Sequence, residues 1–447
     1  VELDFSVLIY LEELLFSSYP ATSLNITGLA NLKRLSLNES QITSLDLTGS
    51  PNIEHLWCFG NDLTFLDVSM LSNLKELKCY GSGLIEHNTA GLTQLENLVC
   101  SFNNLSFLDI GGMNNMKLLK LNDNDLTSLN LAHMQDVEKI DVSYNSLNYL
   151  NVEGLVNLKE LNAHFNSISS LNVQGMNNLE HLVLFDNEIT EFDASGLTSL
   201  IRLSISSNDL TSLNLSCNTS LNYLSCDDNQ LLSLDLTGLI NLNELSCQNN
   251  QLTSLDLSGL INLYTLNCGG EQLTYLDVMS ATMLKTLNVD NNHLEVLLMK
   301  NKMIEETTLE SIFTENMRYI CVEDWMVEIA EQVLTVYGFD CAVNSYCSFS
   351  PAGESYIIQG DNTFDTNNNG CDVNDFSYPN MKFTVTDGIE TVSNISNVSG
   401  AYLIPVRGGA HTVTPILENP NLFTISPASV SVTFPATTSR FTQNFCI

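Results

Sequence analysis

The chain is poor in basic residues. Its 447 residues include 16 Lys plus Arg against 52 Asp plus Glu, a formal net charge of -36 at pH 7. Such a charge repels nucleic acid and anionic lipid, so the composition argues against nucleic acid as a partner. No apolar run approaches the roughly 18 residues that a membrane span needs, which argues against a direct span. Because the chain opens on Val1 rather than Met, we expect that any targeting peptide has been removed.

Motifs of the common enzyme classes are also lacking. The sequence has no His-Glu-x-x-His, no Gly-x-Ser-x-Gly and no phosphate-binding Gly-Lys-Ser/Thr. The seven histidines are scattered along the chain rather than spaced as metal ligands. The sequence therefore predicts a protein that is not an enzyme.

What the chain does have is a repeat of 21 residues. The same apolar slot returns without a slip from Leu14 to Leu287, and Leu242 to Asn262 is one complete copy. A fixed period in the 20s with the pattern L-x-x-L-x-L/C-x-x-N is the signature of the leucine-rich repeat. We therefore predict a mostly β fold, a leucine-rich-repeat solenoid of about 14 coils over residues 11–300.

Asparagine recurs three residues after the Leu/Cys slot, where we expect it to bond backbone groups of a tight turn. This Asn ladder consists of Asn61, Asn103, Asn124, Asn145, Asn166, Asn187, Asn208, Asn229, Asn250 and Asn292. One coil departs from the pattern with Glu271 in place of the ladder Asn, and a second departs further, with Ser82 in the ladder slot and His87 in place of a leucine. We expect that coil to be locally loose.

Both ends of the repeat array are expected to be capped. Residues 1–10 are apolar without the repeat pattern and are predicted to form an N-terminal cap. After Met299 the period fails. Met317 to Val322 predicts a last strand, and the apolar spacing from Asp324 to Gly338 predicts an amphipathic helix. Residues 301–348 are assigned to a C-terminal helical cap and a linker.

The remaining residues, 349–447, are expected to form a small β-sandwich. Short alternating runs separated by Gly, Asn and Pro predict its strands. These runs are Tyr356 to Gln359, Lys382 to Thr386, Tyr402 to Pro405, His411 to Pro415 and Ser429 to Phe434.

Two family resemblances follow from these motifs. Residues 11–299 resemble the 21-residue class of bacterial leucine-rich repeats, which implies a narrow, curved, strand-rich solenoid. Asp365 to Asp372, Thr384 to Gly388 and Ser399 to Tyr402 resemble B-repeat or carboxypeptidase-regulatory-like domains of bacterial surface proteins, an Ig-like type of sandwich. Cys341 to Ile447 as a whole resembles the domain that follows the repeats in Bacteroidetes surface proteins. That resemblance implies export by the type IX secretion pathway and a location at the extracellular or outer-membrane surface of a Gram-negative bacterium.

The twelve cysteines form two populations. Six occupy the Leu/Cys slot and are expected to be buried thiols, since stacked strands hold such side chains roughly 4.8 Å apart, wider than a disulfide favours. They are Cys58, Cys79, Cys100, Cys226, Cys247 and Cys268. The disulfide candidates lie beyond the repeats and are Cys321, Cys341, Cys371 and Cys446. A bond from Cys321 to Cys341 would pin the cap helix, while the connectivity of Cys347, Cys371 and Cys446 stays open.

Variable positions beside the Leu/Cys slot should face outward on the concave side. From the third to the ninth coil they are rich in aromatic rings: His55, Trp57, Phe59, Tyr80, Phe102, Tyr144, His164, Phe165, His181 and Phe185. Exposed rings are enriched at binding sites, so we predict that they contact a protein or glycan partner at the cell surface. The alternative is aromatic packing along the sheet surface.

A calcium site is predicted after the linker. Asp365, Asn367 and Asn369 alternate before Gly370, as in the first half of a calcium loop. The candidate Ca2+ ligands are Asp365, Asn367, Asn369, the carbonyl of Cys371, and Asp375 or Asp372. The alternative is a turn held by Asx hydrogen bonds.

Taken together, the sequence predicts a non-enzymatic extracellular scaffold for adhesion or for capture of a partner, acting through the concave face of the repeats. The alternative is a structural or accessory subunit of an outer-membrane or extracellular assembly.

Overall fold

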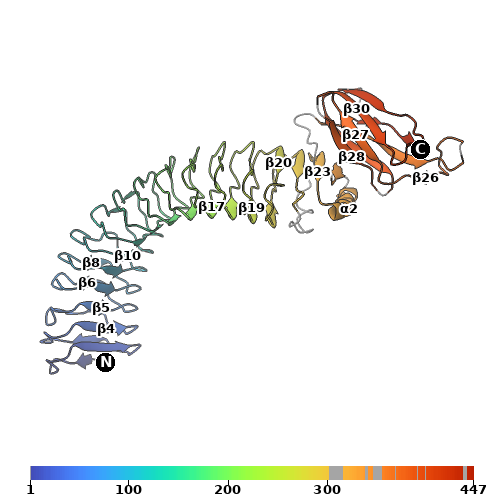
Figure 1. Ribbon diagram of the computed structural model, residues 1–447. Helices are drawn as coiled ribbons and strands as arrows, with labels where there is room; N and C mark the ends of the chain where they lie inside the picture. The colour runs from blue at the N-terminus through green and yellow to red at the C-terminus, as the bar shows by residue number, and fades with distance from the viewer. Residues whose placement is uncertain are drawn as a thin grey trace. The chain divides into compact units, whose positions relative to one another are not determined.

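A computed structural model describes residues 2–301, 316–337, 341–345, 355–367, 369–389, 391–397, 399–435 and 440–447. The chain divides into two compact units, Val1–Gln251 and Leu252–Ile447. In both units the regular secondary structure is mainly β-strand (Figure 1).

The main sheet of the first unit takes one short parallel strand from each repeat. In order, its strands are β2 (Glu13–Ser17), β4 (Arg34–Asn38), β5 (His55–Trp57), β7 (Glu76–Lys78), β9 (Asn97–Val99), β10 (Leu118–Lys120), β12 (Lys139–Asp141), β14 (Glu160–Asn162), β15 (His181–Val183), β16 (Arg202–Ser204), β17 (Tyr223–Ser225) and β18 (Glu244–Ser246). Leu119 lies opposite Leu98 and Ile140, one repeat before and after it. This pairing confirms the 21-residue period.

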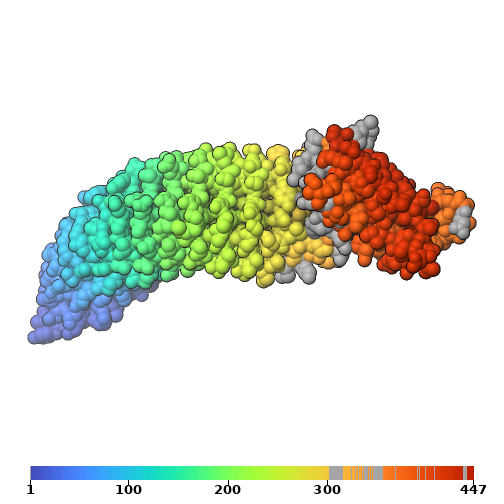
Figure 2. All heavy atoms as spheres, turned by 45° about the horizontal axis from the view of Figure 1, so that its top comes forward, coloured from blue at the N-terminus to red at the C-terminus, as the bar shows by residue number. Residues whose placement is uncertain are grey.

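Within the first unit the coils form a curved stack. Strands β10 and β17 lie on its inner, concave side (Figure 1), and successive coils pack directly against one another (Figure 2). The Leu/Cys slots are buried, so each coil stacks its apolar side chains on those of its neighbours. The six cysteines of this slot, in both units, are buried thiols, as predicted.

A second set of strands comes from the other half of each coil. Parallel pairs form between β1 (Glu2–Asp4) and β3 (Ser23–Asn25), between β6 (Phe65–Asp67) and β8 (Glu86–Asn88), and between β11 (Ser128–Asn130) and β13 (Tyr149–Asn151). Leu3 pairs with Leu24, which shares its slot in the repeat. Residues 2–4 therefore continue the repeat, whereas the sequence analysis treated residues 1–10 as lacking its pattern.

The Asn ladder closes the coils as predicted. At Asn208, Nδ2 donates to the carbonyls of Leu184 and Ile205 (both 3.1 Å), and Oδ1 accepts the Ile189 N–H (3.0 Å). Asn103, Asn124, Asn145, Asn166, Asn187 and Asn229 repeat this pattern. One amide thus satisfies backbone groups of two neighbouring coils, which a turn would otherwise leave unpaired.

The second unit begins with further repeats. Its parallel strands are β19 (Thr265–Asn267) with β21 (Thr286–Asn288), and β20 (Tyr275–Asp277), β22 (Val296–Leu298), β23 (Tyr319–Cys321) and β24 (Ala342–Asn344) in that order. Between β23 and β24 come a 3-10 turn (Asp324–Met326) and helix α2 (Val327–Tyr337). The predicted last strand and helix are confirmed, although Gly338 lies outside the described residues. No helix among the described residues is long and apolar enough to cross a membrane.

The predicted bond between Cys321 and Cys341 is wrong. Cys321 is in a disulfide, but Cys341 carries a thiol. Strands β23 and β24 pair with Cys321 opposite Asn344, and Cys341 lies three residues earlier, roughly 10 Å along the strand direction. Cysteines whose Cα atoms are more than about 7 Å apart cannot be bridged without backbone movement. Cys347, whose pairing stayed open, lies outside the described residues.

Two antiparallel-rich sheets form the last part of the chain. One has β25 (Ser355–Phe364) between β26 (Phe376–Ser377) and β29 (Ala401–Arg407), with β32 (Arg440–Thr442) and β33 (Phe445–Cys446) also paired to β25. The other has the order β28 (Thr391–Ile395), β27 (Lys382–Thr386), β30 (Gly409–Ile416) and β31 (Val430–Phe434). Every strand predicted here from the sequence is present.

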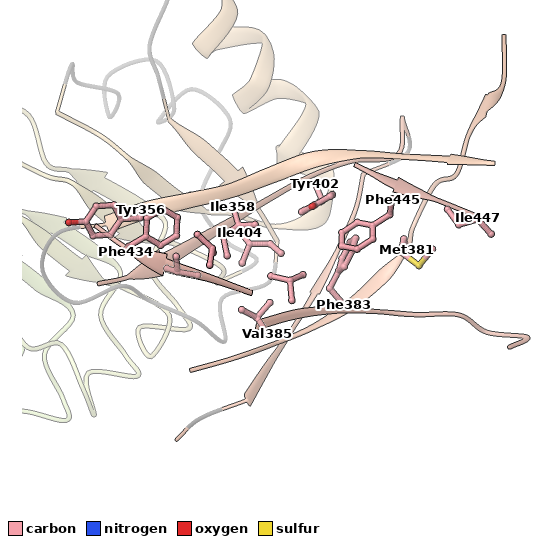
Figure 3. Close-up of a cluster of buried hydrophobic side chains, with 13 residues drawn as sticks. Tyr356, Ile358, Met381, Phe383, Val385, Tyr402, Ile404, Phe434, Phe445 and Ile447 are labelled. Atoms are coloured by element: carbon pink, nitrogen blue, oxygen red, sulfur yellow. The ribbon is translucent and has the colours of Figure 1, made fainter. Parts of the chain in front are cut away.

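The core of this sandwich draws on both sheets (Figure 3). Phe383 of one sheet packs against Tyr402 of the other (ring centroids 4.6 Å apart), and Tyr356 stacks on Phe434 (4.7 Å). A disulfide joins Cys371 to Cys446 with their Cα atoms 5.6 Å apart, which settles part of the connectivity that the sequence left open.

Candidate functional site

Each coil of the first unit bends at a turn residue that has a left-handed backbone. This residue directly precedes the ladder slot and has a φ between 50° and 65° in the coils from Gly60 to Asn249. A left-handed backbone brings Cβ close to the following carbonyl, so Gly, Asn and Asp are the residues that suit it. Six coils obey this preference, with Gly60, Gly81, Asp123, Asp186, Asp228 and Asn249 in the slot, while Ser18, Glu39 and Ser207 occupy it in three others.

Three coils break the preference with aromatic residues. Phe102, Tyr144 and Phe165 have φ values of 56°, 51° and 52°, and their side chains are 59%, 48% and 39% exposed. Neither backbone preference nor burial accounts for a ring at these positions. Strained residues of this kind cluster at functional sites, because another interaction must keep them there.

Two of these rings belong to one aromatic cluster, which consists of Tyr144, His164, Phe165 and Phe185. Tyr144 stacks on Phe165 with ring centroids 4.6 Å apart. His164 stacks on Phe185 at 4.3 Å, and edge contacts join the two stacks. Because these residues come from three consecutive coils, they form a continuous ring surface that we call the central cluster.

An open hollow of ≈ 570 Å³ adjoins the central cluster. It is lined by Tyr144, Asn145, Phe165, Asn166, Asp186, Asn187, Glu188 and Ser207. Two ring faces therefore meet two carboxylates and several amides. Burial lowers the pKa of the nearby His164, despite the opposing influence of Asp141 and Asp186. The combination suits a cationic group, since rings and carboxylates both attract one.

A second group of predicted residues lies on the coils before it. Phe59 stacks on Tyr80 with ring centroids 4.3 Å apart. Glu76 accepts hydrogen bonds from Trp57 Nε1 (3.0 Å) and Lys78 Nζ (2.8 Å), and it lies 3.2 Å from His55 Nδ1.

These contacts give the polar atoms of Trp57, His55 and Glu76 partners within the group itself. Burial acts to raise the pKa of Glu76, but hydrogen bonds from Lys78, Trp57 and His55 lower it below its ordinary value. The Lys78 ammonium also lies 5.0 Å from the centre of the Trp57 ring, which places a cation against its face. For Trp57 and His55, packing along the sheet is therefore a sufficient explanation.

The residues predicted to bind a partner therefore do not form one continuous surface but fall into separate groups. Phe102 lies on a coil between the two groups, and His181 is half-buried on β15. Sequence reasoning missed the acidic side of the hollow, formed by Asp186 and Glu188. The available signal was the slot before the ladder Asn, where a ring replaces the expected Gly, Asn or Asp.

The predicted calcium loop is closed by its own hydrogen bonds. Asp365 Oδ2 accepts the Gly370 N–H (2.8 Å), and Asp375 accepts the N–H groups of Thr366 (3.1 Å) and Asp372 (2.9 Å). These bonds lower the pKa of Asp375. These hydrogen bonds match the Asx-turn alternative. Among the described residues, the acidic side chains of the loop do not bring three ligand atoms within 4.8 Å of one another. Calcium binding stays a prediction.

In-register parallel strands, buried leucine columns and an Asn ladder define a leucine-rich-repeat β-solenoid. Similar solved structures include the functional domain of InlJ from Listeria monocytogenes, 22% identical over 98% of this chain and 90% of that one, with a TM-score of 0.58. That domain includes a cysteine ladder. A leucine-rich-repeat protein of Leptospira interrogans is 24% identical over 75% of this chain and 90% of its own, with a TM-score of 0.58.

A third similar structure is the plant peptide hormone receptor RGFR1 in complex with RGF2. It is 18% identical over 77% of this chain and 68% of its own, with a TM-score of 0.51. No model of a known protein family matches the chain, and no curated protein matches it. At these identities the likeness concerns the fold.

Proposed function

We propose that this chain is a non-enzymatic extracellular scaffold that captures a protein partner at a bacterial outer surface, and that the central cluster is where the partner docks. The observation that carries the proposal is the placement of Tyr144 and Phe165. Both keep exposed rings at backbone positions that favour Gly, Asn or Asp. A binding role accounts for rings that the fold itself does not require.

The chemistry of the hollow favours a Lys or Arg side chain as the partner's anchor. Its cation would lie against the rings of Tyr144 and Phe165 while Asp186 and Glu188 supply the opposite charge. The net charge of -36 acts in the same direction, because it accelerates the approach of basic surfaces. A glycan would also stack on the rings and donate its hydroxyls to the two carboxylates, but a neutral glycan makes no use of their charge.

Three observations support the proposed extracellular location and binding role. One similar structure is a bacterial leucine-rich-repeat domain, and another is a receptor solved with a bound hormone. The disulfide between Cys371 and Cys446 fits an oxidising compartment. The Bacteroidetes resemblance of the C-terminal part adds type IX secretion and the outer-membrane surface to the proposal.

The test replaces the rings by a residue that the turn prefers. In Tyr144→Asn and Phe165→Asn, relief of backbone strain offsets the lost ring contacts, so stability should change by less than about 1 kcal/mol. Peptides selected on the wild-type chain from a random displayed library should be rich in Lys or Arg. We expect them to bind the double variant at least tenfold more weakly in calorimetry.

Tyr149→Asn is the matched control, because Tyr149 is 52% exposed but lies on β13 in the other set of strands. It should leave peptide binding unchanged. Equal binding by the wild type and the double variant would overturn the proposal, as would selection of peptides without cationic residues. Ordered self-assembly of the purified chain, measured by light scattering with and without Ca2+, would favour the structural-subunit alternative.

A further inference from the structure

The coil that begins near Leu77 departs from the repeat in sequence, yet it is not loose. Ser82, in the ladder slot, is fully buried, and its Oγ donates to the Cys58 carbonyl (3.0 Å). Asn103 of the next coil accepts the Ser82 N–H (3.1 Å). The expectation of a loose coil is wrong, because Ser82 and its neighbour together cover the backbone groups of the turn.

The second departure in this coil is His87, which is only 6% exposed. Strand β8 pairs His87 with Leu66, so the imidazole occupies a slot that holds leucine in neighbouring coils. Its Nε2 atom is buried and has no hydrogen-bond partner among the described residues. Its Nδ1 atom lies 3.7 Å from the sulfur of Cys100. A polar ring in an apolar column is unfavourable unless some interaction compensates for its burial.

The partners of His87 are two thiols of the Leu/Cys slot. Lys78 pairs with Val99, so Cys79 and Cys100, the residues that follow them, lie side by side on consecutive coils. Their sulfur atoms are 2.9 Å apart, well beyond the length of about 2.05 Å of a disulfide bond. The ligand atoms of Cys79, His87 and Cys100 all lie within 4.8 Å of one another, and all three residues are buried.

We propose that Cys79, Cys100 and His87 bind one zinc ion inside the solenoid. Thiolate and imidazole are the ligands of structural zinc, at about 2.3 Å for sulfur and 2.0–2.1 Å for nitrogen. Tetrahedral geometry at those lengths places a sulfur and a nitrogen ligand about 3.6 Å apart and two sulfurs about 3.8 Å apart. The distance from Cys100 to His87 already fits, and a small rotation of the two cysteine side chains separates their sulfurs.

Charge balance also suits the interior of the solenoid. Zn2+ displaces the two thiol protons, which leave to solvent, and the ion with two thiolates and a neutral imidazole carries no net charge. A neutral group avoids the penalty of burying an unpaired charge. The ion links the coil of Tyr80 to that of Phe102.

The second run of slot cysteines has no histidine beside it and therefore serves as an internal comparison for the proposed zinc site. Cys226, Cys247 and Cys268 occupy the same slot on three coils, but their coils hold Leu234, Leu255 and Leu276 where His87 lies. Cysteines in the slot are therefore compatible with ordinary core packing. The imidazole is what distinguishes the site near Cys79.

The experiment uses the full chain without an affinity tag, because a polyhistidine tag would itself bind zinc. Since the site is buried, the chain is refolded from denaturant under reducing conditions with Zn2+ or Co2+ and then desalted. We expect about one zinc per chain by elemental analysis. With cobalt we expect the visible bands and thiolate charge-transfer absorption of a tetrahedral cobalt–thiolate site.

His87→Leu should abolish both signals while the chain still folds, because leucine fills this slot in the neighbouring coils. Cys100→Ala should do the same, whereas Cys247→Ala should keep the full metal content. Absence of bound metal in the refolded wild type would overturn the proposal. So would equal metal content in the wild type and His87→Leu, or a mass spectrum showing a Cys79–Cys100 disulfide in protein taken directly from cells.

Discussion

Removal of one rung of the Asn ladder should lower the stability of the solenoid by several kcal/mol. In Asn208→Ala the Ile189 N–H loses its acceptor, and the carbonyls of Leu184, Ile205 and Ser206 lose the two amide hydrogens that they share. Asn208 is only 7% exposed, so water replaces these bonds poorly.

The expected loss follows from these bonds. An orphaned buried N–H costs about 1–3 kcal/mol, and each of two lost bonds costs about 0.5–1.5 kcal/mol, for a total of about 2–6 kcal/mol. That is a large share of the 5–15 kcal/mol typical of a folded domain. The loss should spread to both neighbouring coils, because stability in a repeat array depends on contacts between neighbours.

Urea denaturation followed by circular dichroism measures the loss, with Asn214→Ala as control. Asn214 is an exposed asparagine of the next half-coil whose Oδ1 accepts one N–H, from Ser216 (3.1 Å), so its removal should cost less than about 1 kcal/mol. A loss below about 1 kcal/mol in Asn208→Ala, or equal losses in the two variants, would refute the assignment of the ladder as the element that closes the coils.

Two further predictions concern the sandwich. The disulfide between Cys371 and Cys446 spans 75 residues, so Cys371→Ser should destabilise this part by about 4 kcal/mol in thermal melting, and an unchanged transition would contradict this. Cys217→Ser, which removes an exposed thiol, should have no effect. If the calcium prediction is correct, Ca2+ at about 100 times its dissociation constant should stabilise the chain by about 2.7 kcal/mol relative to EGTA, and Asp365→Asn with Asp375→Asn should abolish that difference. Identical melting in Ca2+ and EGTA would rule the site out.

The candidate binding face was predictable only in part. The positions of the exposed rings follow from the repeat. His55 and Trp57 lie on a strand, where every second residue faces the same side, whereas Tyr144 and Phe165 lie in the turn slot before the ladder Asn. The repeat does not predict which rings are satisfied by neighbours and which stay available for a partner, because that depends on contacts between coils. Glu76 bonds to Trp57 and leaves it satisfied, whereas Tyr144 and Phe165 stay exposed beside Asp186.

The solenoid could be predicted from the sequence, because a strict period sets which residue of one coil lies over which residue of the next. The sequence also predicted the sandwich strands, whose alternation matches the pleat of a half-buried sheet. Only the tertiary structure decided which side chains meet across a coil. The register of β24 separates Cys321 from Cys341, and the stacking of two consecutive coils brings His87 to Cys100. Such contacts join residues whose spacing carries no periodic signal, so they appear only when the chain has folded.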